Sequence, residues 1–118
     1  MTKSKVSIII PPYNGIEVLS ECLDSLFQST YPNIEVIVVD NGSSDDSVDW
    51  LKTNHSQVIV IENDKNLGYA GGCNTGALAA SGEYLLFLNN DTIHNPDFVE
   101  LLADFLDLNS KVAAVQPK

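Results

Sequence analysis

Short polar clusters follow three apolar, β-rich segments of the sequence, and their residue types are those that bind metal ions and nucleotides. They are Pro11-Pro12-Tyr13-Asn14-Gly15, Asp40-Asn41-Gly42-Ser43-Ser44-Asp45 and Asn89-Asn90-Asp91-Thr92. Carboxylate and amide oxygens that converge in one crevice suit a hard cation such as Mg²⁺ or Mn²⁺. Each cluster alone also fits an ordinary turn or helix cap, because Asp, Asn, Gly and Ser are common there. The three clusters together favour a binding site.

A glycine-rich segment adds a fourth candidate, Asn66-Leu67-Gly68-Tyr69-Ala70-Gly71-Gly72-Cys73-Asn74-Thr75-Gly76. Its spacing differs from the Gly-x-Gly-x-x-Gly loop of dinucleotide-binding proteins. Glycine permits close approach of the backbone to a ligand or to a neighbouring element. We interpret Gly71-Gly72 as a helix N-terminus with a phosphate or sugar against it, whereas helix–sheet packing explains Gly76 equally well.

The apolar pattern around these clusters alternates between strands and helices. Short β-rich runs predict strands, and apolar residues at helical spacing predict amphipathic helices. The predicted strands are residues 6–10, 34–39, 58–61, 84–88 and 112–115. The predicted helices are residues 16–28, a short one from Ser44 or Asp45 to Thr53, 70–80 and 96–108.

This alternation predicts an α/β fold, a Rossmann-like three-layer sandwich with a mostly parallel sheet and right-handed crossovers. At 118 residues the chain is expected to be one domain or part of one, spanning residues 1–118. In such sheets ligands bind in the crevice at the carboxyl ends of the strands. The polar clusters follow those ends, so the fold predicts that they meet.

The charge balance limits the ligands that this chain can bind. Its net charge is −10, and all six basic residues are lysines. Such a surface repels nucleic-acid backbones and anionic membranes, so no nucleic-acid partner is expected. Without arginine, a diphosphate must be held by backbone N–H groups, a lysine or a divalent cation on carboxylates. Lys65 is a candidate for that lysine, although a solvated loop lysine fits its position better.

Cysteine usage and hydropathy indicate a soluble, intracellular protein. Cys22 and Cys73 lie in different predicted helices and are expected to be buried free thiols. No Cys-x-x-Cys or Cys/His spacing indicates zinc. No apolar run reaches the ~18–20 residues that span a bilayer, and the N-terminus lacks the apolar core of a signal peptide. We expect a cytoplasmic location, with peripheral membrane attachment open for a longer protein.

The polar and glycine-rich segments, taken in order, resemble the successive signatures of family 2 glycosyltransferases. The matching stretches are residues 6–15, 38–45, 66–74 and 88–92, so the resemblance covers nearly the whole chain. The Asp-Asn-Gly-Ser and Gly-Gly-x-Asn sequences are similar to the rhamnosyltransferase-like branch. The resemblance implies the GT-A fold, with this chain as the N-terminal, nucleotide-sugar-binding part.

The resemblance also implies roles for individual residues. Pro11 and Tyr13 would line the nucleoside pocket, and Asp40 would accept a hydrogen bond from the imide N–H of uracil or thymine. Asp91 would bind Mg²⁺ or Mn²⁺ and bridge it to the diphosphate. The remaining donor-binding candidates would contact ribose, sugar or phosphate: Gly71, Gly72, Asn74, Asn89 and Asn90.

The predicted metal site depends on one carboxylate. The family's Asp-x-Asp motif is here Asn89-Asn90-Asp91, with amides at the first two positions. One carboxylate suffices when phosphate oxygens and water complete the coordination shell, so metal affinity without nucleotide is expected to be weak. His94 is a further candidate ligand, although a surface histidine ahead of Pro96 fits its position better.

The implied reaction is transfer of a sugar from a UDP- or dTDP-sugar to a hydroxyl of a glycan or lipid-linked acceptor. An inverting transferase needs a general base to deprotonate that hydroxyl. In the family this base lies well downstream of the metal motif, so we assign no catalytic residue within residues 1–118. We therefore expect the chain to lack the acceptor-binding part and to bind donor without transferring sugar. Its exposed sheet edge would permit homodimerisation.

Three other functions stay open. A sugar-phosphate nucleotidyltransferase has a similar fold but usually begins with a glycine-rich loop and a basic residue, which are absent after the first strand. A phospho-receiver domain needs an acidic pair there, where this sequence has Pro11-Pro12-Tyr13-Asn14. A non-catalytic module that binds a sugar or nucleotide fits the same residues.

Overall fold

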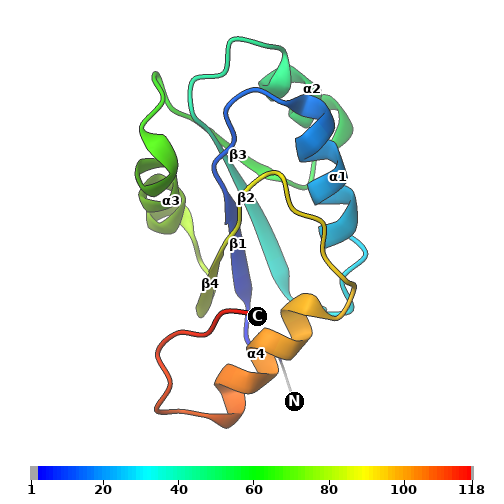
Figure 1. Cartoon of the computed structure of the whole chain (residues 1–118), viewed down its shortest axis with the longest axis vertical. Coiled ribbons are helices and arrows are strands. Elements are labelled where there is room, and N and C mark those ends of the chain that lie inside the picture. The colour runs from blue at the N-terminus through cyan, green and yellow to red at the C-terminus, as the bar shows by residue number, and fades with distance from the viewer. Residues whose placement is uncertain (1–2, 118) are drawn as a thin grey trace.

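The computed structural model describes residues 3–117, in which four strands alternate with four helices (Figure 1). In chain order they are β1 (Val6–Ile10), α1 (Ile16–Leu26), β2 (Ile34–Asp40), α2 (Ser47–Asn54), β3 (Ile59–Glu62), α3 (Gly68–Ala79), β4 (Tyr84–Phe87) and α4 (Phe98–Leu108). The predicted alternation is confirmed, with boundaries shifted by a few residues. Among these helices, none combines the length and the apolar character that crossing a bilayer requires.

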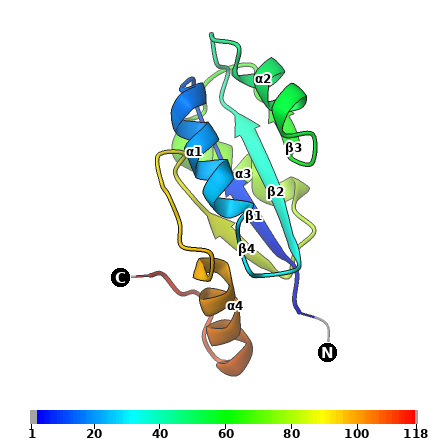
Figure 2. The same cartoon turned by 90° about the vertical axis from the view of Figure 1, so that its right-hand side faces the viewer.

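All four strands pair in parallel, in the order β3-β2-β1-β4, which confirms the predicted sheet. The central strand β1 pairs with β2 on one side and with β4 on the other. All five of its residues are buried, as expected for a strand covered on both faces. The carboxyl ends of the strands consequently point to one edge of the sheet (Figure 2).

Two hydrophobic cores separate the three layers of the sandwich, because alternate side chains of each strand point to opposite faces. Ile8 and its neighbours pack against α1, α2 and α4. Ile9 and Ile37 point to the other face, which α3 covers (Figure 1). Cys22 in α1 and Cys73 in α3 are buried and free, as predicted, and the sheet lies between them.

The predicted fifth strand at residues 112–115 is wrong. Residues 112–117 have no regular structure, and the Val112 N–H closes a turn onto the Asn109 carbonyl oxygen at 2.9 Å. A strand needs a neighbour whose backbone groups complete its hydrogen-bond ladder. Within the described part of the chain this segment pairs with no strand, and Val112 and Val115 stay exposed. Apolar alternation alone therefore gave the wrong prediction here.

A partly buried polar cluster joins the strands at the amino end of the sheet. The Glu35 carboxylate of β2 accepts hydrogen bonds from the Ser7 hydroxyl at 2.5 Å and from the Ser81 backbone N–H at 2.7 Å. Ser7 accepts in turn from the Gly82 N–H at 2.8 Å. Lys5 Nζ lies 3.3 Å from Glu35 Oε1. These contacts tie β1, β2 and the turn between α3 and β4 together.

The same cluster sets the charge of Glu35. Burial alone raises the pKa of this carboxyl, but the bonds donated by Ser7 and Ser81 outweigh it and lower the pKa from 4.5 to about 2. Since the pKa is lower in the folded chain, ionised Glu35 stabilises the fold fully above pH 4.5. That stabilisation is lost as the pH falls toward 2.

Glu35→Gln is expected to lower the free energy of unfolding at pH 7 by about 1–3 kcal/mol, because the amide cannot accept all of these bonds. The deficit should shrink as the pH falls below 4.5, where unmodified Glu35 loses its own contribution. Urea unfolding at several pH values measures both effects.

Glu62→Gln is the matched control for this prediction. The Lys52–Glu62 pair has the same 3.3 Å separation as Lys5–Glu35, but its side chains are 57% and 58% exposed. Its loss should cost at most about 0.5 kcal/mol. Equal effects of the two substitutions would show that the cluster around Glu35 contributes no more than a surface ion pair.

Candidate functional site

The side chain of Asn14 joins the loop after β1 to the loop after β2. Its Oδ1 accepts hydrogen bonds from the backbone N–H groups of Ser44 at 2.8 Å and Asp45 at 3.2 Å. Its own N–H donates to the Ser43 hydroxyl at 2.7 Å. Asn14 has a φ of 54°, in the left-handed region that asparagine tolerates better than most residues. The next N–H, of Gly15, donates to Asp45 Oδ2 at 3.0 Å.

The carboxylate of Asp40 is turned inward and is only 3% exposed. Its Oδ2 accepts from the Ser43 backbone N–H at 2.9 Å, and its Oδ1 accepts from the Ser43 hydroxyl at 2.5 Å. Asp40 therefore holds the β2 loop in shape, and through Ser43 it connects to Asn14. Each oxygen keeps acceptor capacity beyond its bond from Ser43.

Asn41, the next residue, joins the ends of three strands to the start of α3. Its backbone N–H donates to the Pro12 carbonyl oxygen at 3.0 Å, and its side-chain amide donates to the Gly68 carbonyl oxygen at 3.2 Å. The Asn63 amide, after β3, donates to Asn41 Oδ1 at 3.1 Å. The side chain of Asn41 is thus occupied inside the protein.

The glycine-rich segment is placed differently from our interpretation. Helix α3 begins at Gly68, so Gly71 and Gly72 lie in its second turn and not at its N-terminus. Gly72 is buried, and a Cβ there would lie 2.5 Å from Pro11 Cβ and 2.9 Å from Asn41 Nδ2. Close packing of α3 against the strand ends therefore explains Gly72 without a ligand.

Asn74 lies on the exposed side of α3. It shares a helix face with Ala70 and Leu78, both exposed, while the buried face carries Gly72 and Gly76. A Cβ at Gly76 would lie 2.4 Å from Ile9 Cγ2, so the packing explanation for this glycine is supported. Asn74 consequently lies off the face of α3 that packs against the strand ends.

The turn after β4 brings the third cluster to the same edge of the sheet. A Cβ at Gly15 would lie 3.9 Å from Asn90 Nδ2, so this turn lies beside the β1 loop. Asn89 and Asp91 are exposed, and Asn90 is partly buried. Within residues 3–117 no three His, Cys, Asp or Glu side chains are grouped to hold a metal ion.

Tyr13 and Lys65 reach this edge with exposed side chains. Tyr13 is 48% exposed, so its ring is available to pack against a planar base. Pro11, which contacts Gly72, is partly buried. Lys65 approaches the β2 loop through its backbone: a Cβ at Gly42 would lie 3.0 Å from Lys65 Cα. The lysine side chain itself is exposed, as a solvated loop residue would be.

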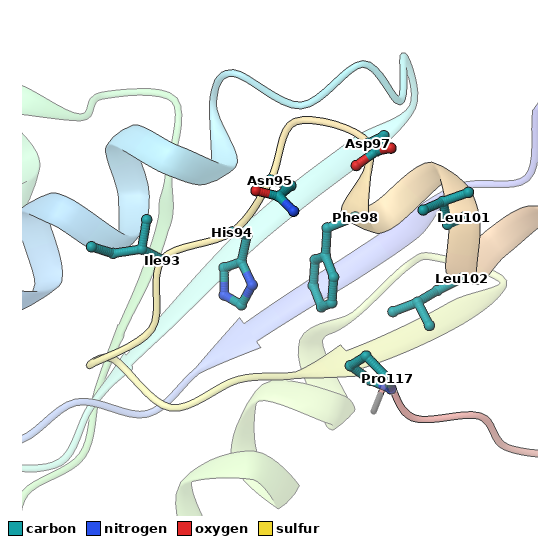
Figure 3. A pocket seen from close by; sticks show the side chains of 8 residues that line it. All are labelled: Ile93, His94, Asn95, Asp97, Phe98, Leu101, Leu102 and Pro117. Carbon is teal, nitrogen blue, oxygen red and sulfur yellow. The ribbon is translucent and has the colours of Figure 1, made fainter.

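His94 is not the surface histidine that the sequence favoured. Its Nε2 lies 2.8 Å from the Thr92 hydroxyl, and its ring stacks on Phe98 with centroids 4.4 Å apart (Figure 3). Burial lowers the pKa of His94. It lines a hollow of about 270 Å³ beside α4. A larger hollow of about 800 Å³, between β4, α4 and residues 113–117, reaches Asn89 and Thr92.

The arrangement therefore suits a ligand that lies across an open edge and brings a cation with it. Asp40 and Asn41 are buried and hold the loops, whereas Tyr13, Asn89 and Asp91 face solvent. The aromatic ring can pack against a base, the amides can bond to hydroxyl groups, and the carboxylate can bind a cation. With no arginine in the chain, a cation on Asp91 is the strongest available means of neutralising a diphosphate.

Comparison with protein families gives a match to the family described as Glycosyl transferase family 2 over residues 7–118. The chain belongs to this family. Membership sets aside the receiver and nucleotidyltransferase alternatives. It also agrees with the four motifs and with the α/β fold found above.

Two relatives of this glycosyl transferase family 2 chain illustrate the match. A poly(ribitol-phosphate) beta-glucosyltransferase of Bacillus spizizenii is 44% identical over 93 residues, covering 74% of this chain. Glycosyltransferase GlyA of Streptococcus pneumoniae serotype 4 is 37% identical over 106 residues, covering 86% of this chain. The chain spans 15% of the length of each of these relatives.

Solved structures give the same fold. S. aureus TarS 1-349 in complex with UDP aligns with a TM-score of 0.82 at 26% identity, covering 97% of this chain and 38% of that chain. The mannosyltransferase PcManGT from Pyrobaculum calidifontis, in complex with GDP-Man and Mn²⁺, aligns with a TM-score of 0.80 at 26% identity. That alignment covers 89% of this chain and 33% of PcManGT. The predicted GT-A-type fold is confirmed.

Sequence reasoning missed the residues that hold the loops of this family 2 chain. Asn14 was named only within the first polar cluster and was given no role of its own, although an Asn-Gly pair after a strand is a signal for a left-handed turn. Thr92 was not singled out, although threonine three residues after Asn89 can bond back to that carbonyl. Both signals are local, but neither says which partner loop the side chain meets.

Gly72→Ala should lower the free energy of unfolding by about 1–3 kcal/mol, because the new Cβ overlaps Pro11 and Asn41. Asn74→Ala, on the exposed face of the same helix, should change it by less than about 0.5 kcal/mol. Urea unfolding compares them. A stable Gly72→Ala chain that loses nucleotide binding would restore the ligand-contact interpretation of this glycine.

Proposed function

We propose that this chain is the donor-binding part of a metal-dependent glycosyltransferase that uses a UDP- or dTDP-sugar. The observation that carries this proposal is the convergence of the β1, β2 and β4 loops at one edge, with Tyr13 and Asp91 exposed there. The UDP and UDP-GlcNAc complexes of TarS support a uridine nucleotide as ligand. The sugar would pass to an acceptor hydroxyl bound by a longer protein.

Asp91 would hold the divalent cation, and the donor set of this turn fits that role. A carboxylate and neighbouring amides are oxygen ligands that Mg²⁺ and Mn²⁺ accept, but one carboxylate cannot hold the cation without phosphate oxygens. When bound, the cation would stabilise negative charge on the leaving diphosphate. Asn89 and Asn90 would then contact ribose or sugar, and Tyr13 and Pro11 the nucleoside.

We also propose an acceptor, a branch of the family and a cellular location. We propose a glycan or lipid-linked acceptor, supported by the relative that acts on poly(ribitol-phosphate). The Asp-Asn-Gly-Ser and Gly-Gly-x-Asn sequences are the support for a rhamnosyltransferase-like branch, a name that neither relative above carries. A cytoplasmic location, where nucleotide sugars are available, is consistent with the proposed donor.

Nucleotide binding tests the central proposal. Thermal unfolding with UDP, dTDP and GDP, each with and without Mn²⁺, should show metal-dependent stabilisation by a pyrimidine diphosphate. At a ligand concentration about 100 times the Kd, this stabilisation is about 2.7 kcal/mol. Asp91→Asn should abolish the metal dependence, whereas Asp24→Asn, on the exposed face of α1, should preserve it. No stabilisation by any nucleotide would contradict donor binding by this chain.

Asp40→Asn separates two roles for the buried carboxylate in the same experiment. A direct bond from the base requires the N3–H of uracil, which cytosine lacks, so unmodified chain should prefer UDP to CDP. If Asp40 contacts the base, the substitution removes that preference. If Asp40 acts only by holding Ser43, both nucleotides should bind more weakly and by the same factor.

The free edge of β4 supports a proposal for self-association. β4 is an edge strand, and Leu85 and Phe87 on it are 44% and 42% exposed. Unpaired edges with apolar side chains are templates for strand pairing between molecules. Sedimentation velocity should show a concentration-dependent dimer that Phe87→Lys weakens. A monomer at every concentration would contradict pairing through this edge.

A further inference from the structure

A side-chain hydroxyl group bonds to the backbone of the turn that carries Asn89, Asn90 and Asp91. Thr92 Oγ1 donates a hydrogen bond to the Asn89 carbonyl oxygen at 2.9 Å, which closes the turn on itself. Cys22 Sγ, from α1, lies 3.9 Å from the same carbonyl oxygen and 3.8 Å from Thr92 Oγ1. The backbone of the turn is therefore bonded next to α1, while Asp91 is exposed.

Thr92 is in turn fixed by His94. A hydroxyl donates only one proton, and Thr92 donates its proton to Asn89, so the 2.8 Å contact places a proton on His94 Nε2. The His94 ring is itself held by stacking on Phe98 of α4 (Figure 3). Its backbone N–H donates to the Ser25 hydroxyl at 3.1 Å.

These contacts form a continuous support from two helices to the turn. Ser25 also donates to the Cys22 carbonyl oxygen at 2.8 Å, so the α1 side of the support is bonded within itself. Among the residues that we place in contact with the donor, these hydrogen bonds reach only Asn89. They reach it through its backbone carbonyl oxygen. If these side chains served only to stabilise the fold, they would not need to bond to this turn.

We propose that Thr92 is a positioning residue for the metal-binding turn, fixing the backbone so that Asp91 meets a cation already bound to a diphosphate. This rests on the proposed function. A site with one carboxylate gains little from the protein alone, so any disorder of that carboxylate directly weakens the shared coordination. Residues that orient metal ligands from behind typically change metal affinity by about 10–100-fold when they are replaced.

Three substitutions test the role of the Thr92 hydroxyl. Thr92→Val keeps the shape and removes the hydrogen bonds, and it should weaken the Mn²⁺ dependence of UDP binding by roughly tenfold or more. Thr92→Ser restores the hydroxyl and should bring the affinity back to within about threefold. His94→Phe keeps the stacking on Phe98 but removes the bond to Thr92, so it should weaken Mn²⁺-dependent binding in the same direction.

Thr30→Val is the matched control. It removes a hydroxyl that lies 2.8 Å from Glu100 Oε2 in α4 and 3.2 Å from the Pro96 carbonyl oxygen, away from the turn. It should leave the Mn²⁺ dependence unchanged. Calorimetry of UDP binding at several Mn²⁺ concentrations gives the affinities, and thermal unfolding without ligand reports the stability of each variant.

The outcomes separate this proposal from the proposed function. If the unmodified chain shows no Mn²⁺-dependent UDP binding, both are overturned. If the unmodified chain and Thr92→Val bind UDP with the same Mn²⁺ dependence, only the role of Thr92 is overturned. If Thr92→Val does not fold, His94→Phe decides: unchanged Mn²⁺ dependence in a folded His94→Phe chain overturns the positioning role.

Discussion

The bonds that Asn14 makes across the carboxyl edge of the sheet are the contacts on which the candidate site depends. Parallel pairing of β1 with β2 places two polar loops side by side, and their backbone groups need partners there. Asn14 supplies them, because one side-chain oxygen accepts from two consecutive N–H groups of the other loop. The left-handed φ of Asn14 aims the side chain across the gap. The bonds from the Gly15 N–H to Asp45 Oδ2 and from the Asn41 N–H to the Pro12 carbonyl oxygen join the same two loops, so Asn14 fixes their separation together with these contacts.

The net charge of the chain is the second constraint, because it limits which ligands the candidate site can bind. A chain with net charge −10 and no arginine cannot attract a diphosphate by itself. A cation must therefore arrive with the nucleotide or be shared with it. An exposed turn with a single carboxylate is consistent with this, since a denser acidic cluster would add repulsion to an already acidic surface. The weak metal affinity that we propose for Asp91 is thus consistent with the charge of the whole chain.

The fold was predictable because periodicity and turn residues act locally. Strand β1 was predicted with its observed boundaries, and the two-sided burial of β1 and β2 agrees with their continuous apolar runs. The segment 112–115 has the same local pattern but lacks a partner strand, which no local signal reports. Gly72 was assigned to a ligand for a similar reason: the sequence shows that a side chain is excluded there, but not that Pro11 and Asn41 exclude it.

The candidate site divides into buried residues that hold loops and exposed residues that are free to meet a ligand. Asp40 and Asn41 belong to the first group, and Tyr13 and Asp91 to the second. Both groups come from the same short motifs, so residue type alone cannot separate them. Burial can, because a buried carboxylate that accepts bonds from its own loop shapes that loop, whereas an exposed carboxylate without such donors keeps its lone pairs for a cation. The proposed donor site is therefore better described as a buried frame with few contact residues than as a pocket lined by its whole motif.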